Sequence, residues 1–205
     1  MQSYTTIQNR AEFEYEDRKS VFIGEAAPVS TEEDALLFIS AMKKKYPDAN
    51  HHVYAYVLRE NSLRRFSDDR EPQGTAGMPV LDAIRKNGCT DAVIVVVRYF
   101  GGTLLGTGGL VRAYSSAANG ALKEANIIVY DIYREYSISV SYSEYQKILP
   151  MLSDNGFRIT DTKFTENVLV YGKIKKDLSE QFITKLSEVT FGRANVELLD
   201  EKFDF

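Results

Sequence analysis

The chain has 205 residues, of which 44% are hydrophobic and 26% are charged, and its formal net charge is −4. This composition is typical of a globular protein with one large domain or two small ones, and it excludes an intrinsically disordered chain. The acidic balance excludes a strongly basic body that binds nucleic acid by bulk charge, although it leaves room for a local basic patch.

The first two thirds of the sequence predict alternating strands and helices. Residues 12–29 read as one or two strands, and residues 30–47 read as an amphipathic helix. Ser30 and Glu33 have the spacing of a capping box for that helix. The next elements are a strand at 51–59, a polar stretch at 64–77, a short helix at 78–88, a buried strand at 91–100, a long helix at 109–126 and a strand at 127–133.

From residue 135 onward the pattern becomes a compact β-α-β-β-α-β cycle, which is typical of a ferredoxin-like domain. We expect Ser143 and Gln146 to cap its first helix and Asp177 to cap its second. The sequence therefore predicts an α+β protein with two domains, residues 1–133 and 135–205, and no low-complexity linker between them. The predicted elements, in order, are a strand at 135–142, a helix at 143–156, two strands within 157–174, a helix at 177–192 and a strand at 194–199.

The stretch VVVRYFGGTLLGTGGLVRAYSS, residues 95–116, concentrates glycine between a buried strand and a helix. A helix start presents unpaired N–H groups, and bare backbone lets an anion approach them closely. Arg98 and Arg112 flank the loop and would supply positive charge, while Leu104 and Leu105 would anchor it to the core. The candidate binding glycines are Gly101, Gly102, Gly106, Gly108 and Gly109.

Two structural explanations compete with that interpretation. The glycines would also serve a tight turn and close helix–sheet packing, and their spacing matches neither the P-loop nor the GxGxxG fingerprint. Arg112 would equally belong to an ordinary solvated helix face.

The polar stretch FSDDREPQGTAG, residues 66–77, holds three carboxylates within four residues. Such a density could bind Mg²⁺ or supply general acids and bases. It could equally cap the following helix and pair with nearby arginines. We expect the segment to lie beside the glycine loop and to share one cleft with it. Its candidate residues are Ser67, Asp68, Asp69 and Glu71.

His51 and His52 are the chain's two histidines, and adjacent strand residues point to opposite faces, so we take only His51 as a cleft candidate. The single cysteine, Cys89, excludes an internal disulfide framework and fits a reducing compartment. Neither a zinc site nor a nucleophile triad is supported by these residues. We therefore expect no catalytic residue, no metal and no cofactor. With no signal peptide and no membrane-length apolar run, the sequence predicts a cytoplasmic protein.

The segments HH, FSDDREPQGTAGMPVL and VVVRYFGGTLLGTGGLVRAY, in this order and spacing, resemble the YigZ/IMPACT family. KSVFI is similar to the opening strand of that family. The resemblance implies a fold like the second domain of ribosomal protein S5 for the N-terminal domain. For the C-terminal domain it implies a fold like the last domain of the translocating elongation factor. One position departs from the family pattern, because Arg70 stands where SDDGEP would have its glycine.

The resemblance also implies a link to translation, since the eukaryotic relatives restrain the amino-acid-starvation kinase by competing for its activator. We therefore expect a non-enzymatic regulator that binds RNA, the ribosome or a translation-associated protein through the glycine loop and its arginines. The alternative is an enzyme or sensor for a small phosphorylated ligand or nucleotide, because the S5-like fold is also used by small-molecule kinases with a phosphate loop. A purely structural or chaperone-like module is a third interpretation. The oligomeric state does not follow from these residues.

Overall fold

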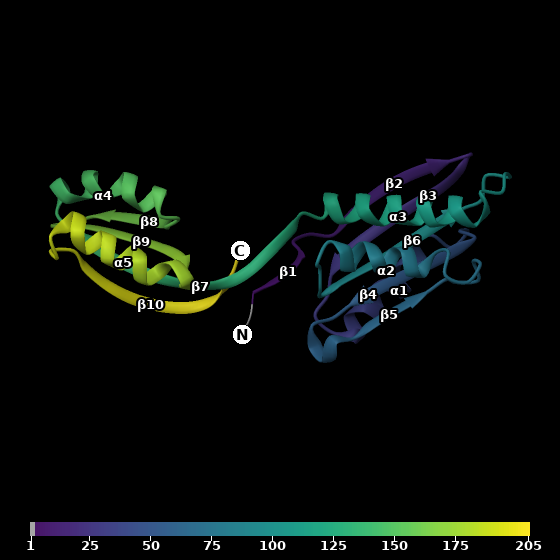
Figure 1. Cartoon of the computed structure of the whole chain (residues 1–205), viewed down its shortest axis with the longest axis horizontal. Coiled ribbons are helices and arrows are strands. Elements are labelled where there is room, and N and C mark those ends of the chain that lie inside the picture. Colours follow the sequence, from purple (N-terminus) through teal and green to yellow (C-terminus); the bar gives the residue numbers. More distant parts are fainter. Residues whose placement is uncertain (1–2) are drawn as a thin grey trace. The chain divides into compact units, whose positions relative to one another are not determined.

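Two antiparallel sheets organise the chain in this computed structural model, which describes residues 3–205 (Figure 1). One compact unit comprises Tyr4–Val129 and is here called the first unit, and the other comprises Tyr130–Phe205 and is called the second unit. Each unit has a hydrophobic core of its own. Five α-helices lie within the described residues, so the predicted mixed α+β class is confirmed.

The first unit is built on a sheet with the strand order β2-β3-β6-β4-β5, in which neighbouring strands are antiparallel. The central strand β6 carries the apolar run predicted to be buried, and its residues 92–97 are inaccessible to solvent. The strands of this sheet are β2 (Ala11–Asp17), β3 (Ser20–Pro28), β4 (His51–Val57), β5 (Arg64–Ser67) and β6 (Ala92–Tyr99).

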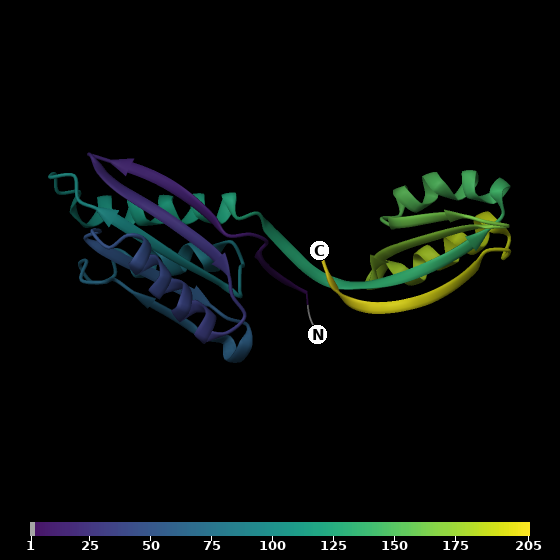
Figure 2. The same ribbon diagram turned by 180° about the vertical axis from the view of Figure 1, so that it is seen from behind.

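Helices cover both faces of this sheet, as Figures 1 and 2 show from opposite sides. Val93, Val95 and Val97 pack in the cluster beneath α1, whereas Ile94 and Val96 face α2 and α3. Because strand side chains alternate between the faces, Arg98 falls on the side of α2 and α3. The helical segments of this unit are α1 (Glu32–Lys45), the short 3₁₀ helix η1 (Glu60–Ser62), α2 (Gly77–Lys86) and α3 (Gly106–Glu124).

The second unit has the predicted order of elements, β7-α4-β8-β9-α5-β10. One core cluster contains Ile148 of α4, Phe182 of α5, and Ile138 and Val170 from the strands, so both helices pack on the same face of the sheet. In the sheet, β7 pairs with β9 and with β10, and β8 pairs with β9. The bounds are β7 (Ile127–Val140), α4 (Tyr142–Asp154), β8 (Arg158–Phe164), β9 (Val168–Lys175), α5 (Lys176–Thr190) and β10 (Asn195–Asp204). The strand β1 (Tyr4–Ile7) belongs to the first unit.

The capping box of α1 lies one residue later than predicted. The Thr31 hydroxyl accepts the N–H of Asp34, and the Asp34 carboxylate accepts the N–H of Thr31. The predicted pair, Ser30 and Glu33, was wrong because the sequence offers two overlapping pairs with the same spacing. The residue at which β3 ends decides which of the two pairs caps α1.

The capping predictions for the second unit were also wrong. Ser141 and Glu144 form the capping box of α4, in place of Ser143 and Gln146. Helix α5 begins with no side-chain cap, and Asp177 lies inside its first turn, where its charge favours the helix dipole.

The polar stretch also contains an element that the sequence pattern did not indicate. β5 is an edge strand, and its residues Arg64, Arg65 and Phe66 are exposed, so no alternation of apolar and polar residues marked it. The two strands predicted at 127–133 and 135–142 form one continuous strand, β7. Among the described helices, none has the length and apolar character needed to span a bilayer.

Candidate functional site

The glycine loop and the acidic segment begin at the same end of the strands of the first sheet. β5 and β6 both run antiparallel to β4, so their carboxyl ends lie beside the first residues of β4. β5 leads there into the acidic segment and α2, and β6 leads into the glycine loop and α3. His51 is the register partner of Arg98 at this end of the strands. The fold therefore gathers the two segments that the sequence singled out.

A buried carboxylate, Glu71, connects the two segments, since its side chain reaches residues of β6 and α3 and Glu71 itself is only 8% exposed. Its Oε1 atom accepts a hydrogen bond from Nη1 of Arg98 at 2.6 Å and from the hydroxyl of Tyr114 at 2.8 Å. The Nε2 atom of His51 lies 3.7 Å from the same oxygen. Burial, and then the nearby Glu71 charge, raise the pKa of Tyr114, so its hydroxyl stays protonated and remains a donor.

Arg98 is an internal cation and not a surface one. It is 6% exposed, and its guanidinium lies 5.4 Å from the ring centroid of Phe22 and 5.5 Å from that of Phe100. Its Nε is the one buried side-chain nitrogen or oxygen of the described residues without a hydrogen-bond partner. Arg98 was expected to provide positive charge for a ligand at the loop. In the structure this charge is paired with the Glu71 carboxylate inside the protein.

Asp68 caps α2. Its carboxylate accepts the N–H groups of Gly74 at 2.9 Å, Ala76 at 3.1 Å and Gly77 at 2.7 Å. A carboxylate in this position occupies the anion site that a helix start provides. The beginning of α2 is therefore filled by the protein's own side chain.

Asp69 forms hydrogen bonds with the first two residues of β4. Its Oδ2 accepts the N–H of His52 at 2.6 Å, and its carbonyl oxygen lies 2.8 Å from Nδ1 of His51. The Ser67 hydroxyl accepts the N–H of Asp69 at 3.2 Å. The carboxylates of Asp68, Asp69 and Glu71 thus serve three different sets of donors. Within residues 3–205 no group of three or more potential metal-ligating side chains converges.

Two successive residues of the acidic segment have left-handed backbone conformations. Asp69 has a φ of 41° and Arg70 has a φ of 70°. A residue with a Cβ has a steric cost there that glycine does not. Arg70 therefore takes the conformation suited to the glycine of the SDDGEP pattern, although it has a large side chain.

The glycines of the loop have different local roles. A Cβ added to Gly101 would lie 2.1 Å from the carbonyl carbon of Lys19, so Gly101 allows close packing against the turn between β2 and β3. Gly102 and Gly106 have φ values of 84° and 72°, as a turn requires. Gly108 is exposed, and a Cβ added there would meet no atom within 4 Å, whereas Gly109 is buried, and a Cβ there would lie 2.8 Å from the Cβ of Leu105.

The first turn of α3 is open to solvent. No side chain caps it, and Gly106, Thr107 and Gly108 are exposed. Arg112 is exposed on the next turn of the helix. Leu104 is 80% exposed, so its predicted role as an anchor was wrong. Leu105 alone packs against the core, because the loop turns Leu104 outward.

Sequence analysis predicted the helix at 109–126 but did not identify Tyr114 as a partner of the acidic segment. A phenol in a stripe otherwise made of Ala and Leu is the signal that could have identified it, since a buried hydroxyl needs a partner.

Comparisons with known proteins agree over most of the chain. The model of the Impact N-terminal domain matches residues 18–122, and that of a domain of unknown function matches residues 138–193. The chain is 34% identical over 198 residues to the IMPACT family member YvyE of Bacillus subtilis, covering 96% of this chain and 91% of that protein. It is 34% identical over 187 residues to the IMPACT family member YigZ of Escherichia coli, covering 90% and 91%.

More distant and structural relatives complete the comparison. Protein IMPACT of Xenopus laevis is 33% identical over 94 residues, which cover 44% of this chain and 30% of that protein. A crystal structure of a hypothetical protein aligns with a TM-score of 0.61 and 31% identity, covering 98% of this chain and 100% of that one.

Proposed function

The chain belongs to the IMPACT family, and from this premise we propose that it is a non-enzymatic, translation-linked regulator. It binds RNA, the ribosome or a translation-associated protein at the glycine loop, residues 101–109, and at the first turn of α3. The family relationship supports the link to translation, and the geometry of the loop supports the location of the binding surface.

The finer fold assignment belongs to the same proposal. Residues 1–133 form a domain like the second domain of ribosomal protein S5, and residues 135–205 form a ferredoxin-like domain. Support for the second part is the β-α-β-β-α-β order of the second unit with both helices on one face.

One observation carries the proposed location: the first turn of α3 is exposed, uncapped and nearly free of side chains. A helix of 19 residues concentrates unpaired N–H groups and a positive dipole end at that turn. Asp68 fills the corresponding site of α2, whereas within residues 3–205 no carboxylate accepts the N–H groups at the start of α3. Arg112 adds a full positive charge on the following turn. An anionic group of a partner fits this arrangement.

The buried network supports a binding role over a catalytic one. Arg98 and Tyr114 both donate to the Glu71 carboxylate, and all three residues are buried, so Glu71 links the segment before α2 to β6 and α3 beneath the loop. Such a network favours a preorganised loop, and a preorganised loop loses less conformational entropy when a partner binds.

The proposal is tested by co-sedimentation of the full chain with purified ribosomes. A second test measures how much RNA and translation factor the immobilised full chain retains, with and without ribonuclease. Arg112→Glu should weaken binding about tenfold or more, since a charge-assisted contact contributes roughly 1.5–3 kcal/mol. Gly108→Asp should weaken it too, although the new carboxylate suits the helix start and should leave the melting temperature unchanged or higher.

The matched control is Lys147→Glu, which makes the same change of charge at an exposed helical lysine of the second unit. Its binding should equal that of the wild type. A wild-type chain that retains none of the three partner classes contradicts the proposal. So does equal binding by all the variants.

A further inference from the structure

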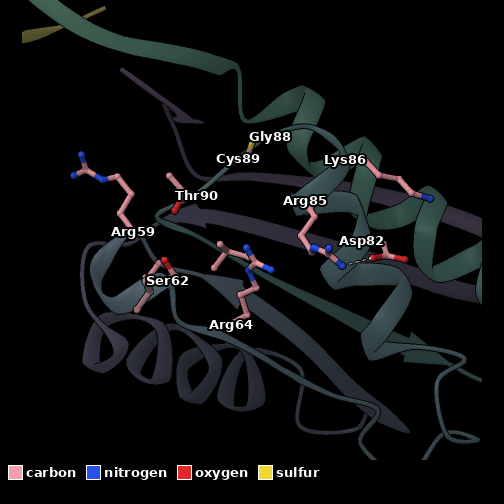
Figure 3. Close-up of a pocket in the computed structure, with 11 residues that line it drawn as sticks. Arg59, Ser62, Arg64, Asp82, Arg85, Lys86, Gly88, Cys89 and Thr90 are labelled. Atoms are coloured by element: carbon pink, nitrogen blue, oxygen red, sulfur yellow. Dashed lines mark hydrogen bonds and ion pairs between the residues drawn. The ribbon is translucent and has the colours of Figure 1, made fainter. Parts of the chain in front are cut away.

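A hollow of about 720 Å³ opens on the first unit, at the end of the sheet's strands that is far from the glycine loop. It lies where β4 ends and β5 begins, beside η1 and the last turn of α2 (Figure 3). This volume is within the range of roughly 300–1,000 Å³ that small-molecule ligands occupy. Buried Val57, Leu58 and Cys89 contribute its apolar part.

The lining of this hollow is strongly basic, with four cationic side chains against the single carboxylate of Asp82. Such a concentration stands out in a chain whose net charge is −4. The four cations are Arg59, Arg64, Arg85 and Lys86, and together with their surroundings they are called the basic pocket.

Two of these cations already have acidic partners. Nε of Arg59 lies 2.7 Å from Oδ2 of Asp91, and Nη1 of Arg85 lies 3.4 Å from Oδ1 of Asp82. The described part of the chain shows no ion pair for the other two, Arg64 and Lys86. The pocket therefore holds positive charge that the protein itself does not neutralise.

The helix dipole accounts for only part of this charge. Basic residues favour the last turn of a helix, which explains Arg85 and Lys86 in α2. Arg64 comes from β5, a separate element. Its presence here is independent of the helix dipole.

Arg64 and Arg85 both line the hollow, and the guanidinium of Arg85 reaches toward Asp82, as Figure 3 shows. Two like charges that line one hollow raise the free energy of the empty pocket, and a bound anion lowers it. Ser62 and Thr90 add hydroxyl groups to the lining. Planar guanidinium groups and an ammonium group match the several oxygens of a phosphate.

We propose that the basic pocket binds a phosphate ester of about nucleotide size, whose phosphates are held by Arg64, Arg85 and Lys86. The same chemistry is presented by a free nucleotide and by the backbone of an RNA strand. The proposal does not depend on the function proposed for the glycine loop, which lies at the other end of the strands.

The test is titration of the full chain with three probes: pyrophosphate, ATP and a short single-stranded RNA. At least one probe should bind more tightly than about 1 mM, and the double variant Arg64→Gln/Lys86→Gln should bind it at least about tenfold more weakly. The matched control is Lys43→Gln/Lys44→Gln, which removes two exposed lysines of α1 and should bind like the wild type.

The outcomes separate the two sources of phosphate. Binding of ATP that pyrophosphate displaces, without binding of RNA, supports the pocket and identifies a free nucleotide. Binding of RNA that weakens with added salt and is displaced by ATP supports the pocket and identifies the RNA backbone. The proposal is overturned if no probe binds, or if the double variant weakens binding no more than the control does.

Discussion

Arg98 and Glu71 are 27 positions apart in the sequence, and their side chains meet at 2.6 Å inside the first unit. The contact joins the end of the central strand to the segment before α2. It also explains why neither residue is available as a surface charge, since both are buried.

Removing the carboxylate of this pair should destabilise the first unit strongly. Glu71→Ala leaves the buried Arg98 without its counter-charge, and breaking such a pair typically costs about 3–5 kcal/mol. The measurement is the free energy of unfolding in urea. Glu124→Gln, at the exposed end of α3, is the control and should change it by less than about 0.5 kcal/mol. Equal effects from the two variants would show that the buried pair contributes nothing to stability.

Replacing Arg70 by glycine should stabilise the protein. The φ of 70° at this position costs a residue with a Cβ about 1 kcal/mol, and glycine removes the cost. We expect a higher melting temperature for Arg70→Gly. Arg65→Gly is the control, because Arg65 lies in β5 without a positive φ and should lose stability on the same change. A lower melting temperature for Arg70→Gly would contradict the strain inferred here.

Two loop glycines should respond in opposite ways to the same substitution. Gly101→Ala places a methyl group against the backbone of Lys19, and such overpacking costs about 1–3 kcal/mol or more. Gly108→Ala meets open space inside a helix, where alanine is favoured by up to about 1 kcal/mol. Thermal melting of both variants checks the prediction. Similar destabilisation by both would mean that the turn, and not the packing at Gly101, sets the glycine requirement.

The second unit should lose stability in acid. The hydrogen bond from Arg193, followed by that from Ser141, holds the pKa of Glu144 below its ordinary value of 4.5, and Lys176 and then Arg134 lower that of Glu201. A folded-state pKa below the unfolded one gives stability that is complete above the unfolded value and is lost as the pH falls through the folded one.

Hydrogen exchange of α4 should therefore quicken as the pH falls below about 4.5, after correction for the intrinsic dependence of exchange on pH. Glu144→Gln should make the remaining dependence shallower, because an amide does not titrate. An unchanged pH profile in this variant would show that the ion pair with Arg193 does not contribute.

Local patterns in the sequence determined the elements of this protein and much of their order. The apolar run in β6 and the alanine stripe of α3 are periodicities that a strand and a helix create by their own geometry. The β-α-β-β-α-β order of the second unit follows from the same reasoning. Where two local solutions had equal spacing, as with Ser30 and Thr31, the sequence could not choose between them.

The tertiary structure decided which distant groups meet. It brought Glu71 to Arg98 and Tyr114, and it placed Arg64 of β5 and Arg85 of α2 in the lining of one pocket. It also turned Leu104 into solvent and kept Leu105 in the core. Periodicity reports only the side of its own element on which a residue lies. Whether a charge is neutralised by a partner or stays unpaired in a pocket depends on how strands and helices pack. That packing minimises the free energy of the whole unit rather than that of any single segment.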